Sequence, residues 1–102
     1  MKIIPNPITF DWDQGNIDKN LVKHNVTIKE AEEVFESQPN FVLEDVKHSL
    51  AEARYMIWGF TKNNRKLTIF FTIRESKIRI ISARDMHKKE RIQYDKTIQE
   101  NT

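Results

Sequence analysis

Side chains that can transfer protons or bind phosphate are concentrated in the second half of this sequence. RNA carries its own nucleophile, the 2′-hydroxyl, so its cleavage needs only a base, an acid and donors for the charge that develops on phosphorus. Histidine, lysine, tyrosine and arginine can supply these functions without a metal ion. The candidate residues for such chemistry are His48, Tyr55, Arg79, Arg84, Arg91 and Tyr94.

The distribution of charge along the chain favours a phosphate-bearing partner. The formal net charge of the 102 residues is only +2. Residues 1–51 have five lysines and no arginine against nine acidic residues, whereas residues 52–102 have six lysines and six arginines against six acidic residues. Because a guanidinium group can bind phosphate through two parallel hydrogen bonds, the second half is the expected binding region. The alternative is an ordinary solvated surface.

Other kinds of chemistry lack their sequence signals. The three histidines, His24, His48 and His87, are scattered, cysteine is absent, and no ligands have the spacing of a metal site. The only glycines are Gly15 and Gly59, which excludes a glycine-rich phosphate loop. We therefore expect no metal ion and no cofactor.

The sequence favours one cytoplasmic domain over residues 1–102. This length is usual for a single domain, and the chain contains no repeat or linker. Residues 1–10 contain one lysine and two prolines, and no apolar stretch long enough for a signal peptide or a membrane span. The absence of cysteine fits a reducing compartment. We expect no association with a membrane.

Hydrophobic periodicity predicts an α+β fold. Asn25 can end a helix in the left-handed conformation, and Thr27-Ile28-Lys29-Glu30 is a capping box that starts the next one. Helices are expected from Gln14 to His24, from Thr27 to Pro39 and from Met86 to Ile98. Between the second and third helices the apolar period falls to two residues, which predicts strands at Phe41 to Asp45, Arg54 to Phe60, Lys66 to Arg74 and Lys77 to Ala83.

Tight turns at Asn63-Asn64 and Glu75-Ser76 would determine which side chains share a face of an antiparallel sheet. With two-residue turns, Ile73 opposes Ile78, Phe71 opposes Ile80 and Ile69 opposes Ser82, and Met56, Trp58 and Phe60 join this apolar face. The two N-terminal helices are expected to pack on it, since their apolar stripes have a suitable size.

The opposite face would then carry cations, hydroxyls and rings, which single-stranded nucleic acid needs for its phosphates and bases. The alternative is the solvent side of a one-sided sheet. Arg84 would lie on the apolar face, so it could bind phosphate only if the strand ended there. The residues expected on the cationic face include Tyr55, Lys66, Thr72, Arg74, Lys77 and Arg79.

Several candidate residues also have structural explanations. Tyr94 can anchor the last helix by packing, and His24 can be a satisfied histidine on a helix face. Glu52 and Arg54 lie two residues apart and can form an ion pair. His48 precedes a strand in a loop, where functional groups often lie.

Three segments are more specific than any single residue. They are His48-Ser49-x-x-Glu52-x-Arg54, the run from Ile78 to Arg84, and Glu90-Arg91-x-x-Tyr94. Together with Trp12-Asp13 and Lys23-His24, these motifs resemble the BrnT family of toxins from bacterial toxin–antitoxin pairs. The resemblance extends from about Phe10 to Tyr94.

The resemblance implies a fold similar to the RelE-type ribonuclease toxins and inhibition of translation by RNA cleavage. It also implies neutralisation by a BrnA-like antitoxin with a ribbon-helix-helix DNA-binding domain, so that DNA is contacted only through the antitoxin. In such an endoribonuclease we expect His48, Arg79, Arg84 and Tyr94 to be catalytic, and RNA to be bound by Tyr55, Lys66, Arg74, Lys77 and Arg91.

Two other functions compete with this interpretation. The first is a non-catalytic RNA- or partner-binding module of the same fold. The second is a DNA-binding regulator, in which the basic helix from Met86 to Ile98 would be the recognition helix.

Overall fold

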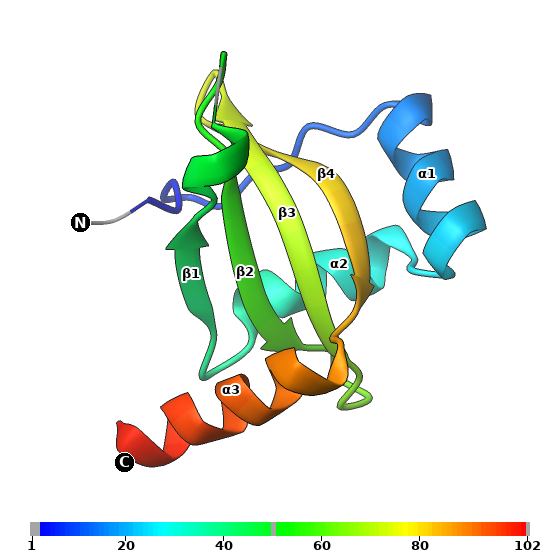
Figure 1. The fold of residues 1–102 in the computed structure, drawn as a ribbon. Coiled ribbons are helices and arrows are strands. Elements are labelled where there is room, and N and C mark those ends of the chain that lie inside the picture. Colours follow the sequence, from blue (N-terminus) through cyan, green and yellow to red (C-terminus); the bar gives the residue numbers. More distant parts are fainter. Residues whose placement is uncertain (1–2, 50, 102) are drawn as a thin grey trace.

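The computed structural model describes residues 3–49 and 51–101, and it confirms the α+β class. The three expected helices and the four expected strands after Pro39 are present, and a short 3₁₀ helix adds to them (Figure 1). The alternation of apolar and polar residues over Phe10 to Asp13 also suggests a short strand, but that prediction was wrong, because the segment makes only an isolated bridge between Phe10 and Ile78. In chain order the elements are α1 (Gln14–His24), α2 (Ile28–Glu36), β1 (Phe41–Glu44), η1 (Val46–His48), β2 (Tyr55–Phe60), β3 (Lys66–Arg74), β4 (Lys77–Asp85) and α3 (Lys88–Glu100).

Side-chain caps set the boundaries of the first two helices. Asp13 accepts the backbone N–H of Asn16, and Thr27 accepts that of Glu30, each at 3.1 Å. These bonds satisfy donors that the first turn of a helix leaves without a partner. Asn25 ends α1 with φ 53°, the left-handed conformation predicted for it.

Within the described residues, four strands form one antiparallel sheet in the order β1-β2-β3-β4. The predicted two-residue turn joins β3 to β4, and the pairs Ile73–Ile78 and Phe71–Ile80 are confirmed. A bulge between Phe70 and Phe71 then shifts the register. As a result Ile69 opposes Ala83, and the predicted pairing with Ser82 was wrong.

The predicted face of β2 was also wrong. Phe60 pairs with Lys66, so residues 61–65 form a longer connection than the expected two-residue turn. A slip of one residue moves every side chain of a strand to the other face. Tyr55 therefore lies opposite Phe71, with ring centroids 5.6 Å apart, on the face that we expected to be apolar.

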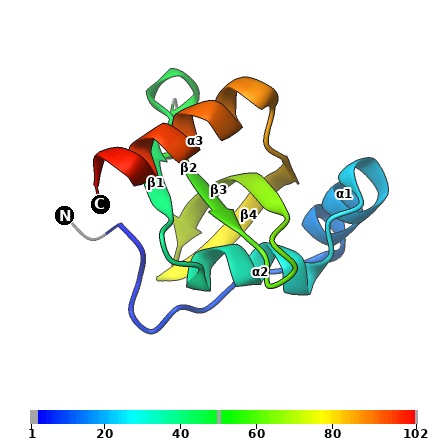
Figure 2. The same cartoon turned by 90° about the horizontal axis from the view of Figure 1, so that it is seen from below.

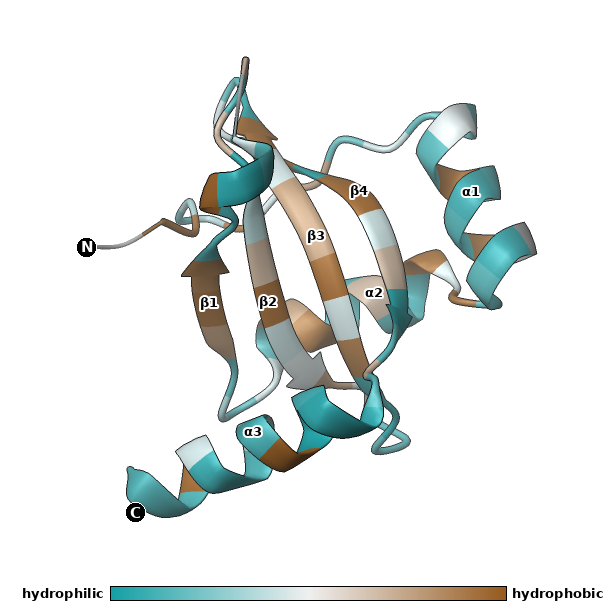
Figure 3. Ribbon diagram, viewed as in Figure 1, coloured by the Kyte–Doolittle hydropathy of each residue, from teal (hydrophilic) through white to brown (hydrophobic). Residues whose placement is uncertain are grey.

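Each face of the sheet carries a hydrophobic core of its own. We call the face that packs on α2 the inner face and the face that packs on α3 the outer face; the two helices lie on opposite sides of the sheet in Figure 2. Hydrophobic residues are frequent along the strands, whereas the residues of α1 and α3 are mostly hydrophilic (Figure 3). The inner core consists of Val26, Ala31, Val34, Phe35, Ile57, Leu67, Ile69, Phe71, Ile78, Ile80 and Ala83, and the outer one is built on Trp58, Met86 and Tyr94.

The first helix lies beside the sheet and does not cover its face as predicted. Its apolar residue Leu21 is 43% exposed, and it buries Asn16 and Asn20 instead. The amide of Asn16 donates to Ile80 O at 3.0 Å, and Ala83 N donates to the amide oxygen of Asn20 at 2.9 Å. These amides satisfy backbone groups of the edge strand β4, so α1 lies along that edge.

Candidate active site on the outer face of the sheet

A hollow of about 340 Å³ opens where the start of α1 meets the outer face of the sheet. Four elements contribute to it: α1, the loop between β1 and β2, β3 and β4. Its cations outnumber the carboxylates in its wall, and a buried hydroxyl lies among them. The charged and hydroxyl side chains that line it are Lys19, Glu52, Arg54, Thr72, Arg74 and Arg79.

Arg79 lines this hollow beside Gly15, Asn16 and Lys19 of α1. Its side chain is 20% exposed, and it opposes Thr72 in the register of the sheet. Its Nη2 donates to Asp13 Oδ2 at 2.8 Å, and its Nη1 lies 3.6 Å from Asp11 Oδ2. The backbone N–H of Asn16 and the guanidinium of Arg79 lower the pKa of Asp13. Arg79 is therefore held in place, with N–H groups left for a further anion.

Glu52 and Arg74 form a two-bond ion pair at the rim of the hollow. Arg74 donates from Nε at 2.8 Å and from Nη2 at 3.1 Å to the two oxygens of Glu52. This contact lowers the pKa of Glu52, and the positive charges of Arg79 and Arg54 lower it further. The same contact raises the pKa of Arg74. From the sequence, Arg54 was the expected ion-pair partner of Glu52. In the structure Glu52 pairs with Arg74 of β3 instead.

The loop that carries Glu52 is closed by its own hydrogen bonds. Asp45 N donates to Arg54 O at 2.8 Å, and the Ser49 hydroxyl accepts from Arg54 N at 2.9 Å. The hydroxyl of Thr72 donates to Ala53 O at 2.7 Å, which ties the loop to β3. The loop and η1 lie on the same side of the sheet as α3 in both views (Figures 1 and 2).

His48 belongs to this closed loop and is turned to solvent. Its side chain is 57% exposed, and Nδ1 lies 3.0 Å from Asp45 Oδ2. A carboxylate beside one ring nitrogen orients the ring and leaves Nε2 for another partner. The structure thus has a histidine, oriented by Asp45, on the same loop as Glu52.

Arg84 lies on the outer face, because the bulge in β3–β4 moves it out of the position that the regular register predicts. It opposes Thr68, and its guanidinium lies 5.7 Å from the ring centre of Phe70. Its Nη1 and Nη2 donate to Glu90 at 2.7 and 3.1 Å. At about 3.3 Å of strand per residue, Arg84 lies roughly 15 Å from Arg79, so the two arginines cannot hold the same phosphate.

Two of the expected site residues lie in hydrophobic cores. Tyr94 is 1% exposed, and its hydroxyl donates to Pro39 O at 2.7 Å. Burial and the neighbouring Asp95 raise its pKa. Tyr55 packs on the inner face. We therefore leave both out of the proposed site.

Of the remaining residues expected to contact RNA, Arg74 lines the hollow, and Lys66, Lys77 and Arg91 do not. Lys66 lies 3.2 Å from Asp95 and over the ring of Tyr94, so it pairs with α3. Lys77 and Arg91 are exposed.

Three charged residues of the hollow were not among our predicted site residues: Lys19, Glu52 and Arg54. The motif of Glu52 and Arg54 was visible, but we interpreted the two as an ion pair. Lys19 gave no signal, because nothing in the sequence indicates that α1 lies beside β4.

Within residues 3–49 and 51–101, no three His, Asp or Glu side chains are grouped so that they could hold a metal ion. No helix there is both long and apolar enough to cross a membrane.

The fold and the hollow define a class: a small α+β protein whose antiparallel sheet carries a cation-lined hollow with a carboxylate, suited to a phosphodiester. A model of the BrnT family, the ribonuclease toxin of type II toxin–antitoxin systems, matches residues 12–90. The chain belongs to this family, which confirms the resemblance. A type II system pairs such a toxin with an antitoxin. No curated protein matched the chain in our comparison.

Proposed function

We propose that this protein is a metal-independent endoribonuclease whose active site is the hollow around Arg79. The observation that carries the proposal is the position of Glu52, a carboxylate that interacts with Arg74, Arg79 and Arg54 at one opening. Arginines can bind the phosphodiester and stabilise the charge of the pentacoordinate transition state, which is the role that a metal ion plays in other nucleases.

The proton transfers are assigned to Glu52 and His48. The carboxylate of Glu52, whose pKa the bonds from Arg74 lower, accepts the proton of the 2′-hydroxyl. The 2′-oxygen then attacks phosphorus, and the bond from phosphorus to the 5′-oxygen breaks. His48 donates a proton from Nε2 to the leaving 5′-oxygen. The products are a 2′,3′-cyclic phosphate and a 5′-hydroxyl, and no water, metal ion or cofactor is consumed.

The partners follow from the family and from the charge of the site. We propose that the antitoxin is BrnA-like, with a ribbon-helix-helix domain, and that it covers the cationic hollow with an acidic segment. Complementary charge would speed this association, and occlusion would block RNA. We further propose that the fold is RelE-like, that the toxin acts in the cytoplasm, and that RNA cleavage inhibits translation.

The test is an incubation of the purified protein with an RNA oligonucleotide in the presence of EDTA. Cleavage to fragments that end in a 2′,3′-cyclic phosphate is expected, and an oligonucleotide with one 2′-deoxy residue should be uncut at that position. Products that appear only after magnesium is added would overturn the metal-independent mechanism. Binding without products would support the non-catalytic module instead.

A further inference from the structure

A second hollow, of about 490 Å³, lies at the C-terminal end of α1, whose N-terminal end borders the first hollow. It is lined by Lys23, His24 and Asn25 at the end of α1, by Arg84 and Asp85 at the end of β4, and by His87. The first hollow lies between the start of α1 and the middle of β4. The two hollows therefore lie at the two ends of the contact between α1 and β4.

Both elements of this contact carry cations. Lys19 and Lys23 are four residues apart and thus lie on one face of α1, about 6 Å apart along its axis. Arg79 and Arg84 project from β4 onto the outer face. Between α1 and β4, the amides of Asn16 and Asn20 bind the backbone of β4.

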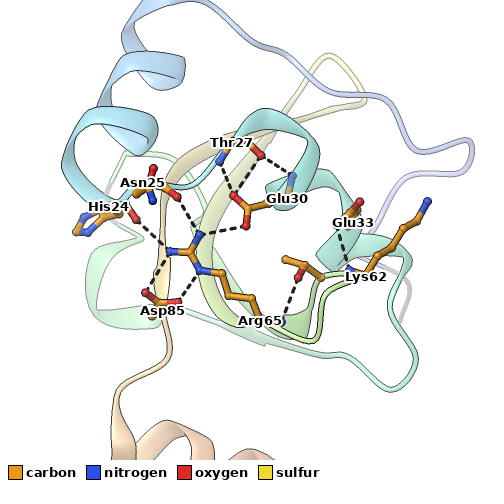
Figure 4. Close-up of polar contacts among 9 residues, drawn as sticks. His24, Asn25, Thr27, Glu30, Glu33, Lys62, Arg65 and Asp85 are labelled. Atoms are coloured by element: carbon orange, nitrogen blue, oxygen red, sulfur yellow. Dashed lines mark hydrogen bonds and ion pairs between the residues drawn. The ribbon is translucent and has the colours of Figure 1, made fainter.

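The two carboxylates beside the second hollow are already paired. Arg65 donates to both oxygens of Asp85, at 2.7 and 3.1 Å (Figure 4). Glu90 accepts from Arg84 through both of its oxygens. Among the described residues, no carboxylate lies within 4.0 Å of the Lys23 ammonium. The Lys23 ammonium is thus available to an anion. His24 and His87 line the same hollow, and His87 Nδ1 lies 3.9 Å from Glu90 Oε1, which leaves its Nε2 for a further partner.

The distance between the two hollows fits a strand of several nucleotides. Arg79 and Arg84 are separated by roughly 15 Å of strand, estimated from the rise per residue. A stacked nucleic-acid strand carries one phosphate about every 3.4 Å along its axis, and an extended strand fewer. The phosphate at the second hollow would therefore lie about four nucleotides from the one at Arg79 in a stacked strand, and fewer in an extended one.

We propose that the hollow lined by Lys23, His24, Arg84 and His87 is a second phosphate subsite, which binds the backbone of the same RNA strand that is cut at Arg79. This inference rests on the proposed function, because the first hollow must hold the scissile phosphate. Lys23, His24 and His87 contact the phosphate. Arg84, held by Glu90, forms the wall behind them. The subsite gives the enzyme a preference for substrates longer than the nucleotides that fill the first hollow.

The test compares the binding of a trinucleotide and an octanucleotide, both made of deoxyribonucleotides so that neither can be cut. Fluorescence anisotropy gives the Kd of each for the full-length protein and for Lys23→Ala, Lys23→Arg and Lys96→Ala. Lys96 is exposed on α3, which runs away from α1 (Figure 1), so its variant loses the same charge at a distance from both hollows.

Lys23→Ala should raise the Kd of the octanucleotide about fivefold to tenfold, lower the slope of log K against log salt by about 0.7, and leave the trinucleotide unaffected. Lys23→Arg should bind like the original protein, and Lys96→Ala should show no dependence on length. Equal weakening of both oligonucleotides, or equal effects of Lys23→Ala and Lys96→Ala, would overturn the subsite. Because the probes have no 2′-hydroxyl, this outcome is independent of whether the protein cleaves RNA.

Discussion

Arg65 and Asp85 join the start of β3 to the end of β4 through two hydrogen bonds, of 2.7 and 3.1 Å (Figure 4). The same guanidinium donates to Glu30 at 3.1 Å and to the backbone oxygens of Asn25 and His24 at 2.8 and 3.2 Å. The hydrogen bonds to Asp85 and Glu30 raise the pKa of the Arg65 guanidinium above its ordinary value. One side chain thus connects the sheet to the segment between α1 and α2, which positions α1 beside β4.

Replacing Arg65 by Ala is expected to lower the free energy of unfolding by about 2 kcal/mol, because several acceptors lose a charged donor together. Urea unfolding followed by circular dichroism measures the change. Lys62→Ala in the same turn is the matched control, because only the backbone N–H of Lys62 is bonded, to Glu33. Equal stability of the two variants would show that the Arg65 contacts contribute nothing measurable.

Glu90 makes the stability of the protein depend on acidic pH. Burial alone would raise its pKa, but the bonds from Arg84, the His87 N–H and the Thr68 hydroxyl together lower it. A carboxylate with a lowered folded-state pKa stabilises the fold above its unfolded pKa, about 4.3, and loses this contribution as the pH falls through the folded value.

Stability should therefore decrease between about pH 5 and pH 3, and Glu90→Gln should show a shallower decrease. At pH 7 the variant should be less stable by about 1–2 kcal/mol. Thermal unfolding at a series of pH values measures both effects. Glu36→Gln, exposed at the end of α2, serves as the control and should follow the original protein. Parallel curves for Glu90→Gln and the original protein would contradict the assignment.

Gly59 is required where β2 passes closest to α2. A Cβ at this position would lie 2.5 Å from Ser37 Oγ and 2.9 Å from Val34 Cγ1. Ser37 is fixed by its bond to Val34 O at 2.6 Å, so it cannot move away without losing that bond. Gly59→Ala should cost about 3 kcal/mol, seen as a lower Tm. At Gly15 the nearest atom is 3.2 Å away, and Gly15→Ala should change the Tm less.

Tyr94 is expected to contribute to the stability of the fold and not to RNA cleavage. Tyr94→Phe removes the bond to Pro39 O and should lower the free energy of unfolding by about 1 kcal/mol. The rate of RNA cleavage per folded molecule should not change, because the hydroxyl is buried in the outer core. A large loss of kcat with normal stability would return Tyr94 to the catalytic residues.

The helices and strands could be predicted from the sequence where local signals specify them. Asp13 and Asn25 cap α1, and its predicted bounds were confirmed. The turn at Glu75-Ser76, the weaker of the two turn candidates in the sequence, is present, with φ of 51° and 64° at its two residues. Both signals act through neighbours in the chain.

The candidate site was less predictable because it depends on register and packing. Nothing in the residues around Phe70 indicates a bulge, yet the bulge decides that Arg84 lies on the outer face. The five-residue connection before Lys66 decides that Tyr55 lies on the inner face. The contact of α1 with β4 depends on two buried asparagines, which periodicity treats as polar surface. That contact brings Lys19 into the hollow.

Arg79 is the residue on which the proposed chemistry depends most. Arg79→Ala should lower kcat for RNA cleavage by roughly 10²- to 10³-fold and relieve growth arrest in cells that express the protein, because the transition state loses its main donor. Folding should persist, since Asp11 and Asp13 are 39% and 53% exposed and water can solvate them once the guanidinium is gone. Circular dichroism checks the fold. Lys29→Ala on α2 removes a cation beside the other face and should cleave normally. Unchanged toxicity of Arg79→Ala, with its fold intact, would exclude Arg79 from the active site.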